Sequence, residues 1–497
     1  MSTHLPTGAS AAYPRTSSGL PTPSNSLVLL LLVIVAIFYA STLRPGHIWG
    51  DDFAMYIHHA QNIVEGQPYA ETGYIFNAAA PVSPRMYPPV FPLLLAPIYK
   101  IYGTNLTPMK LEQVIFFVLA LAFVYIFWKP DLGPAYSAAL VAILGFSPIF
   151  WAAKDNVLSD LPFLLFFYVA AVLVRWSAND ALGKKTWDVL IGLSLYVAIG
   201  TRSAGIALIG GLVLYDLLKT RTLKRTAVAL SVCAGFLFLQ SWFVGSGLRN
   251  YDGHFHPTLH SVGTNLISYP RALAGFWVAS TRNRFSFAVL FAIALLTVVG
   301  AYFRYKRGLT IVEAFLAPYF ALMILWPFSP GIRLAFPLVP WIVFLALYGL
   351  RNLAMRLAPR YSTAALCALV LLISIPYGLA YHKMDFGPIP ESTGLPEFNS
   401  LCDAVRDRTS PADVLIYYRA RALSLYTRRK ASSYNRNGTE PELVQWASSI
   451  HANYLITTDA FDEDQGFLLR YVEHHPSNLE LVYQNAHFKL YRIAADF

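Results

Sequence analysis

Long apolar runs, interrupted by short polar connections, fill most of the chain between residues 27 and 381. A helix needs about 20 apolar residues to cross the hydrocarbon core of a bilayer, and many of these runs approach that length. The expected apolar segments lie at 27–43, 89–103, 112–128, 136–152, 161–177, 187–200, 204–218, 226–245, 286–303, 311–328, 333–350 and 362–381. The pattern predicts an α-helical polytopic membrane protein with about 11–13 transmembrane helices.

The end of the chain has a different pattern, in which shorter runs alternate between strand-like and helix-like periods. The strand-like runs lie at 413–418, 454–458, 479–483 and 488–493. Residues 395–407 have the period of a helix. We therefore expect a small α/β domain after the membrane region.

These patterns divide the chain into three parts. Residues 1–25 are rich in Ser, Thr, Pro and Gly, which predicts a disordered N-terminal tail. Residues 26–382 form the predicted transmembrane domain, with a first outer loop at 44–88 and a second at 246–284. Residues 383–497 form the predicted soluble domain. We expect the first apolar run to stay in place as a signal anchor, because many further spans follow it.

Composition excludes a soluble protein, and the distribution of charge predicts the topology. Of 497 residues, 56% are hydrophobic and 13% are charged, and the formal net charge is +10. Lys and Arg gather in the short connections near 175–185, 219–225, 304–307 and 351–360, where the positive-inside rule places the cytoplasm. The N-terminus is then cytoplasmic and the C-terminal domain extracytoplasmic, and nucleic acid is not a predicted partner. The three cysteines indicate no disulfide framework.

One apolar segment breaks the alternation of spans. Three segments separate the first outer loop from Asp160, although both are expected outside. Residues 89–103 form a short segment containing Pro89, Pro92 and Pro97, so we expect it to be re-entrant or juxtamembrane. A missed or split helix elsewhere would restore the alternation equally well.

Acidic residues stand out directly after the first span. Asp51 and Asp52 are adjacent carboxylates at the expected membrane surface, which suggests a functional role. A helix N-cap pair, or solvated loop acids ahead of Phe53, would explain them as well. The two explanations are compatible.

Several motifs in a fixed order carry a family resemblance. The acidic pair is followed by Glu65-Gly66-x-x-Tyr69 and then by Tyr87-Pro88-Pro89. The later motifs are Phe146-Ser147-Pro148, Ser159-Asp160, Thr201-Arg202-Ser203-Ala204-Gly205 and Gly331-Ile332-Arg333-Leu334-Ala335-Phe336-Pro337. This order resembles the GT-C membrane glycosyltransferases, and more narrowly the bacterial branch related to protein O-mannosyltransferases and lipid A aminoarabinose transferases.

The resemblance implies the catalytic residues, the donor and the place of reaction. Asp51 would be the catalytic carboxylate, assisted by Asp52 or Asp160. The implied activity is an inverting glycosyltransferase that takes a sugar from a polyprenyl-phosphate-linked donor. The acceptor would be a glycan, lipid or protein at the extracytoplasmic face of a bacterial inner membrane. A transporter or flippase of a lipid-linked glycan is the alternative, but clustering of ionisable residues at one face suits catalysis better.

The expected chemistry requires cations more than a general acid. A sugar that leaves a phosphate carrier expels an anion of low pKa, whose charge needs stabilising. The candidate donor phosphate ligands, all near span ends on the predicted outer side, are Arg85, Lys154, Arg202 and Arg333. Snorkelling to lipid headgroups is the simpler explanation for Arg85 and Lys154, whereas Arg202 and Arg333 stand in very short turns between apolar segments, which favours a functional role over snorkelling. Tyr87 stands where relatives often carry Lys or His, so the identity of one phosphate ligand stays open.

Two further features of the sequence could bind a ligand: acids and histidines that could hold a divalent metal, and a surface of Arg and Tyr residues in the tail. Asp51, Asp52 and Asp160 could hold Mg²⁺ or Mn²⁺. His254, His256 and His260 have a spacing that a metal could use, although scattered loop histidines explain them more simply. No cofactor is otherwise indicated. In the tail, 417–422 and 426–430 combine Arg and Tyr, which could contact an anionic glycan or lipid headgroups, or could form a solvated helix with packed tyrosines.

Overall fold

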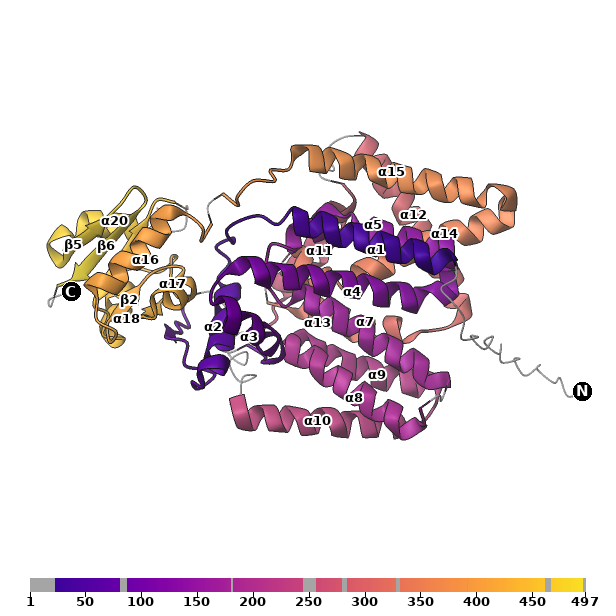
Figure 1. Cartoon of the computed structure of the whole chain (residues 1–497), viewed down its shortest axis with the longest axis horizontal. Helices are drawn as coiled ribbons and strands as arrows, with labels where there is room; N and C mark the ends of the chain where they lie inside the picture. Colours follow the sequence, from indigo (N-terminus) through magenta and orange to yellow (C-terminus); the bar gives the residue numbers. More distant parts are fainter. Residues whose placement is uncertain are drawn as a thin grey trace, which may run out of the picture.

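The computed structural model describes residues 23–80, 87–179, 182–244, 256–278, 284–327, 331–390, 392–460 and 466–494. Figure 1 shows an elongated helical body with a smaller α/β unit at one end. The long helices of the body are α1 (Pro23–Ser41), α4 (Leu106–Leu132), α5 (Pro134–Gly145), α7 (Asp160–Trp176), α8 (Lys184–Thr201), α9 (Ala207–Lys219), α10 (Lys224–Val244), α12 (Arg284–Arg307), α13 (Ile311–Leu325), α14 (Leu338–Leu357) and α15 (Ser362–Lys383). The predicted helical polytopic class is confirmed.

Length and composition mark part of this body as membrane-spanning. In the described residues, five stretches are long and apolar enough to cross a bilayer: 106–132, 224–242, 284–307, 338–357 and 359–383. Shorter apolar helices lie at 25–41, 90–102, 134–145 and 311–325. The chain is thus a multi-pass membrane protein, while the total of 11–13 spans stays a prediction.

Glycine and proline residues determine where α4 ends and α5 begins, and glycines determine how closely α12 and α14 pack. Gly133, at φ +74°, ends α4, and Pro134 begins α5, so two apolar runs become two helices. Gly300 of α12 and Gly349 of α14 face each other's helix, and a Cβ atom at either would collide with a carbonyl oxygen of the other helix. Small residues therefore allow the backbones of α12 and α14 to approach closely.

The first outer loop folds into two short helices beside the bundle. Helix α2 (Asp52–Glu65) ends at Gly66, which adopts the left-handed conformation at φ 67°. Helix α3 (Val90–Tyr102) packs against α2. Its 13 residues extend about 20 Å, less than the thickness of a hydrocarbon core. Helices α5 and α9 are as short, with 12 and 13 residues, so the re-entrant or juxtamembrane place of 89–103 stays a prediction.

The second outer loop contains a helix that the sequence patterns did not predict. Helix α11 (Leu259–Trp277) begins with a capping box between Thr258 and Ser261 and includes Pro270. The polar residues within it, such as Asn265, kept it from reading as an apolar run. Asn265 Nδ2 donates to the carbonyl oxygen of Trp326 at 2.7 Å, which ties α11 to the end of α13.

The tail forms the predicted α/β domain around a six-stranded sheet of order β1-β3-β2-β4-β6-β5. Its strands are β2 (Val414–Ile416), β3 (Lys430–Ser432), β4 (Tyr454–Thr458), β5 (Leu479–Gln484) and β6 (Phe488–Ile493). The helices packed around it are α16 (Pro396–Arg408), α17 (Ala420–Thr427), α18 (Glu440–Ser449) and α20 (Leu468–His474). Strands β2, β4, β5 and β6 match predicted runs, whereas the short β3 was not predicted.

The edge strand of this sheet comes from the other end of the chain. Strand β1 (Tyr74–Ile75) belongs to the first outer loop and pairs in parallel with β3, with Tyr74 opposite Ala431. A second connection is the antiparallel bridge between Ile48 and Ser392. The first outer loop and the tail therefore share one sheet, which a division of the chain at residue 383 does not describe.

Candidate active site

Two helix N-termini bring the predicted acids to the same place. Asp52 is the first residue of α2 and Asp160 the first residue of α7, where the helix dipole favours a carboxylate. The Tyr56 and Ser159 hydroxyl groups lie 2.8 Å apart and join the two helix starts. Asp51 occupies the N-cap position of α2, but its side chain makes no capping hydrogen bond. Helix capping therefore does not explain the Asp51 carboxylate.

Two arginines from turns between helices surround Asp160. Arg202 Nη1 lies 2.7 Å from Asp160 Oδ1, and Arg333 donates from Nε (3.1 Å) and Nη2 (3.0 Å) to Oδ2. Arg333 Nη1 also lies 3.5 Å from Asp52 Oδ2, so it bridges the two acids. The Arg333 side chain is 35% exposed, against 17% for Arg202. These contacts argue against snorkelling to lipid headgroups as the role of either arginine.

A third arginine comes from the tail domain. Arg421, in the first turn of α17, places Nε 3.4 Å from Asp51 Oδ2 and Nη1 3.4 Å from Asp52 Oδ1. The same Nη1 donates to the Tyr87 hydroxyl at 2.7 Å, and that hydroxyl donates to Asp52 Oδ1 at 2.9 Å. Only 4% of the Arg421 side chain is exposed. Tyr87 thus lies in the site through a hydroxyl group that links Arg421 to Asp52.

The position of Arg421 fits neither explanation offered for 417–422. A surface for a glycan or lipid headgroups and a solvated helix were both possible, yet Arg421 is buried and contacts Asp51 and Asp52 of the first outer loop. The available signal was its place just after β2, because the carboxyl ends of parallel strands commonly carry binding residues. Its partners, 369 and 370 positions away, had no local signature.

Burial sets the protonation properties of two residues in this loop. Asp51 is 2% exposed, and burial raises the pKa of its carboxyl group, while Arg421 and Arg419 act in the opposite direction. Asp51 Oδ1 is buried and has no hydrogen-bond partner among the described residues. His47 is fully buried, and burial lowers its pKa to about 3. Asp51 Oδ1 is therefore an unused acceptor, and His47 is a neutral structural group.

The hydrogen bonds of His47 fit the neutral ring that burial favours. Its Nε2 accepts from the Val157 backbone N–H at 2.9 Å, and Nδ1 lies 2.9 Å from the Ile48 carbonyl oxygen. One ring nitrogen is thus an acceptor and the other a donor, as in neutral imidazole. His47 also stacks on Phe53 with ring centres 4.0 Å apart, which fixes the start of α2.

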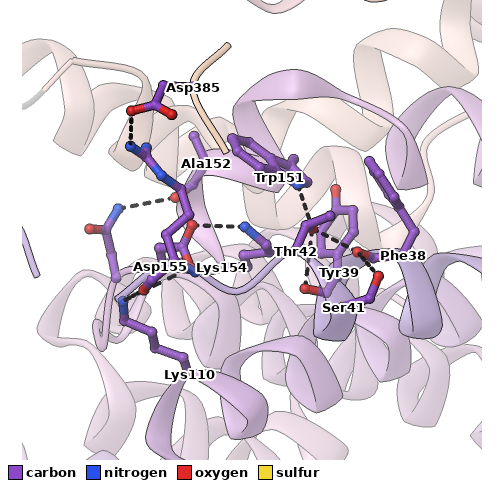
Figure 2. A network of polar contacts seen from close by, with 12 residues as sticks. Phe38, Tyr39, Ser41, Thr42, Lys110, Trp151, Ala152, Lys154, Asp155 and Asp385 are labelled. Carbon is purple, nitrogen blue, oxygen red and sulfur yellow. Dashed lines mark hydrogen bonds and ion pairs between the residues drawn. The ribbon is translucent and has the colours of Figure 1, made fainter. Parts of the chain in front are cut away.

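Lys154 lies in a different polar network, shown in Figure 2. Its Nζ is 2.7 Å from Asp155 Oδ2 and 3.8 Å from the centre of the Trp151 ring, and the side chain is fully buried. The Arg44 backbone N–H donates to Asp155 Oδ1 at 3.0 Å, and Lys110 Nζ lies 4.0 Å from that oxygen. This network joins the end of α1 to the start of α4 and to α6 (Pro148–Ala153). The geometry gives no support for Lys154 as a phosphate ligand.

The structure describes only some of the remaining candidate ligands of phosphate and metal. Arg85 and His254 lie outside the described residues, whereas His256 and His260 are exposed near the start of α11. In the described part of the chain, no group of three or more His, Cys, Asp or Glu side chains could hold a metal ion. The three carboxylates of the site face guanidinium groups instead. Removal of metal ions with EDTA tests whether an ion binds at these acids.

Comparisons with known proteins concern the fold that carries this site. Residues 86–244 match the family described as dolichyl-phosphate-mannose-protein mannosyltransferase. The chain is similar to ArnT from Cupriavidus metallidurans bound to undecaprenyl phosphate, with a TM-score of 0.55 and 13% identity over 94% of this chain and 98% of that one. The apo state of ArnT matches with a TM-score of 0.60, 15% identity and the same coverage. The chain has the GT-C fold.

A third match extends the GT-C resemblance to archaea. The oligosaccharyltransferase AglB from Archaeoglobus fulgidus, in complex with an inhibitory peptide and a dolichol-phosphate, aligns with a TM-score of 0.51 and 12% identity. The alignment covers 86% of this chain and 69% of that one. No curated protein sequence matches the chain. The predicted resemblance to GT-C glycosyltransferases is thus confirmed, and the likeness to solved structures establishes the fold.

Proposed function

We propose that this protein is an inverting glycosyltransferase that transfers a sugar from a polyprenyl-phosphate-linked donor to an acceptor hydroxyl. The observation that carries the proposal is the convergence of Asp52 and Asp160 with Arg202 and Arg333 at one end of the helical body, with Asp51 beside Asp52 and paired with Arg421. Structures with the same fold contain undecaprenyl phosphate or dolichol-phosphate, which supports a lipid-phosphate donor. The acceptor is a glycan, a lipid or a protein.

Asp51 is the proposed general base. The acceptor oxygen attacks the anomeric carbon while the bond from that carbon to the phosphate oxygen breaks, and the electron pair leaves with the phosphate. Asp51 Oδ1 takes the acceptor proton, because it is the carboxylate oxygen in this cluster with no hydrogen-bond partner among the described residues. Attack from the side opposite the phosphate inverts the configuration of the sugar.

Arg333 and Arg202 are the proposed ligands of the leaving phosphate. Asp160 holds both guanidinium groups, and the more exposed Arg333 keeps part of its surface open to a ligand. As the bond to the sugar breaks, negative charge grows on the phosphate, and preorganised cations stabilise it without reorganisation. Asp160 is then a positioning residue, and Asp52 keeps Arg333 and Tyr87 in place.

The site is proposed to face the outside of a bacterial inner membrane, with the N-terminus in the cytoplasm. The orientation rests on the basic connections near Lys184 and Arg225. Cysteines introduced one at a time beside Arg202 and beside Lys184 test it with a membrane-impermeant thiol reagent. Labelling of intact cells beside Arg202 only is expected, and labelling beside Lys184 only would place the site in the cytoplasm.

The deciding experiment measures transfer of labelled sugar by purified protein in detergent. Polyprenyl-phosphate-linked sugars serve as donors, and membrane extracts of a deletion strain supply acceptors. Transfer by the wild type and its loss in Asp51→Asn are expected. If reconstituted vesicles instead moved the intact lipid-linked glycan across the bilayer without transfer, the protein would be a flippase.

A further inference from the structure

We infer that Arg421 of the tail domain is a positioning residue of the active site, which holds the Asp51–Asp52 pair and Tyr87 in their catalytic arrangement. The inference rests on the proposed function, and it gives the tail domain a direct part in the reaction. Arg421 belongs to the tail and contacts both Asp51 and Asp52 of the first outer loop.

The contacts of Arg421 are those of a group that organises its neighbours. One guanidinium reaches both adjacent carboxylates at 3.4 Å and donates to the Tyr87 hydroxyl at 2.7 Å. Guanidinium has a planar set of donors, so it can serve three acceptors at once, which an ammonium group cannot do with the same geometry. The Asp51 side chain is 1% exposed and the Asp52 side chain 22% exposed, so water screens the contact between Arg421 and Asp51 little.

The tail is fastened to the first outer loop on both sides of this contact. The Ser424 hydroxyl of α17 donates to the Thr72 carbonyl oxygen at 2.7 Å, and the Arg421 guanidinium carbon lies 5.6 Å from the centre of the Tyr74 ring. Gly73 sits between them at φ +68°, where a Cβ atom would lie 2.6 Å from Ser424 Oγ. The close approach therefore needs glycine. These contacts join α17 to the segment of the first outer loop that follows α2.

Electrostatics explains why the acid pair needs Arg421. The charged groups that act on Asp51 are Arg421 and Arg419 from the tail and Asp52 from α2. Burial and Asp52 raise the Asp51 pKa, and the two arginines lower it. Asp52 has a further cation, Arg333, on its other oxygen. Removing the Arg421 charge therefore affects Asp51 most, because burial and Asp52 then act against only Arg419 and the backbone hydrogen bond from Arg421.

Arg421→Gln tests the inference, because glutamine keeps hydrogen bonding and removes the charge. We expect kcat to fall about 10²-fold, as for loss of a preorganised active-site group. We also expect the ascending limb of the pH profile of kcat to move by about one pH unit or more to higher pH. The sign follows from Asp51, which must be ionised to take a proton and has a higher pKa without Arg421. If Arg421 had only a structural role, its replacement would lower the stability of the protein and leave the ascending limb of the pH profile of kcat at the same pH.

The matched control is Arg428→Asn. Arg428 lies at the end of the same helix and forms an ion pair of 2.9 Å with Glu65 of α2, but 64% of its side chain is exposed. It adopts φ +56°, which asparagine tolerates. The control thus removes an ion pair between the same two elements away from the acids. The kcat of this variant, and the pH at which its kcat rises, are expected to match those of the wild type.

The outcomes separate this inference from the proposed function. Wild-type kcat and an unshifted limb in Arg421→Gln, with Asp51→Asn inactive, would overturn the role of Arg421 and leave the glycosyltransferase intact. Activity in Asp51→Asn would overturn the proposed base itself. If Arg421→Gln fails to fold, Arg421→Lys is the deciding variant, because lysine keeps the positive charge but lacks the planar donor groups of guanidinium. A wild-type kcat in Arg421→Lys would overturn the positioning role. A lowered kcat would support it.

Discussion

Two clusters of acids and arginines lie at opposite ends of α7, and only one of them is the proposed active site. Asp160 begins this helix, and Arg175 lies in its last turn. At the Arg175 end, Asp131 contacts Arg175 at 3.0 Å and Arg304 at 3.6 Å. Both clusters join helices that are distant in sequence, so ion pairing alone does not distinguish them.

The two clusters differ in how many of their carboxylate oxygens have a hydrogen-bond or ion-pair partner. At the Arg175 end, both oxygens of Asp131 face arginines, and Arg304 Nε donates to Glu313 Oε1 at 3.0 Å. The other Glu313 oxygen accepts from the Thr310 backbone N–H at 2.7 Å, as part of a capping box. At the Asp160 end, Asp51 Oδ1 is buried without a hydrogen-bond partner in the described residues. Complete pairing suits a structural network, and an unused buried acceptor suits a base.

The comparison predicts its largest effect at Asp51. Asp51→Asn keeps the size of the side chain but cannot take a proton, so kcat should fall by about 10² to 10⁴ while the protein still folds. Sugar transfer by purified enzyme measures this, with thermal unfolding in parallel. Asp52→Asn should reduce kcat less, because Asp52 holds Arg333 and Tyr87. Single and double variants with wild-type turnover would disprove a carboxylate base.

The next effect concerns the arginines that hold Asp160. Arg333→Ala and Arg202→Ala each remove a cation from the proposed phosphate site, so losses of about 10² in kcat/KM for the donor are expected. Arg351→Ala is a matched control at the other end, where Nη1 donates to the Asp131 carbonyl oxygen at 3.1 Å. Both site variants within a few-fold of the wild type would remove these arginines from the mechanism.

The Arg175 end should respond in stability. Asp131→Asn leaves Arg175 and Arg304 without their shared carboxylate, and breaking this partly buried pair costs about 2 kcal/mol, between the values for exposed and buried pairs. The melting temperature should therefore drop, whereas kcat per folded molecule should stay near that of the wild type. A large loss of kcat at an unchanged melting temperature would contradict the structural role of this cluster.

Metal removal should have the smallest effect. The carboxylates of Asp51, Asp52 and Asp160 face arginines, and this pairing leaves little room for a shared cation. We expect kcat to change by less than about twofold in EDTA, since the arginines already supply positive charge. Loss of activity in EDTA that Mg²⁺ or Mn²⁺ restores would show that the acids rearrange around an ion.

The sequence by itself determined the class of this protein and most of its acids and cations. Hydrophobic period and run length are local properties, so they predicted the helical membrane body and most strands of the tail. Motif order indicated Asp160, Arg202 and Arg333, and the structure brings the three together.

Only the tertiary structure decided which charged residues share a site. Lys154, only six positions from Asp160, pairs with Asp155 in another network, whereas Arg421 reaches Asp51 across 370 positions. Strand β1, with two residues, is too short for a periodic signal and forms only because β3 supplies its hydrogen bonds. Partners for buried charges are selected by packing between distant segments, and no local pattern of residues records that choice.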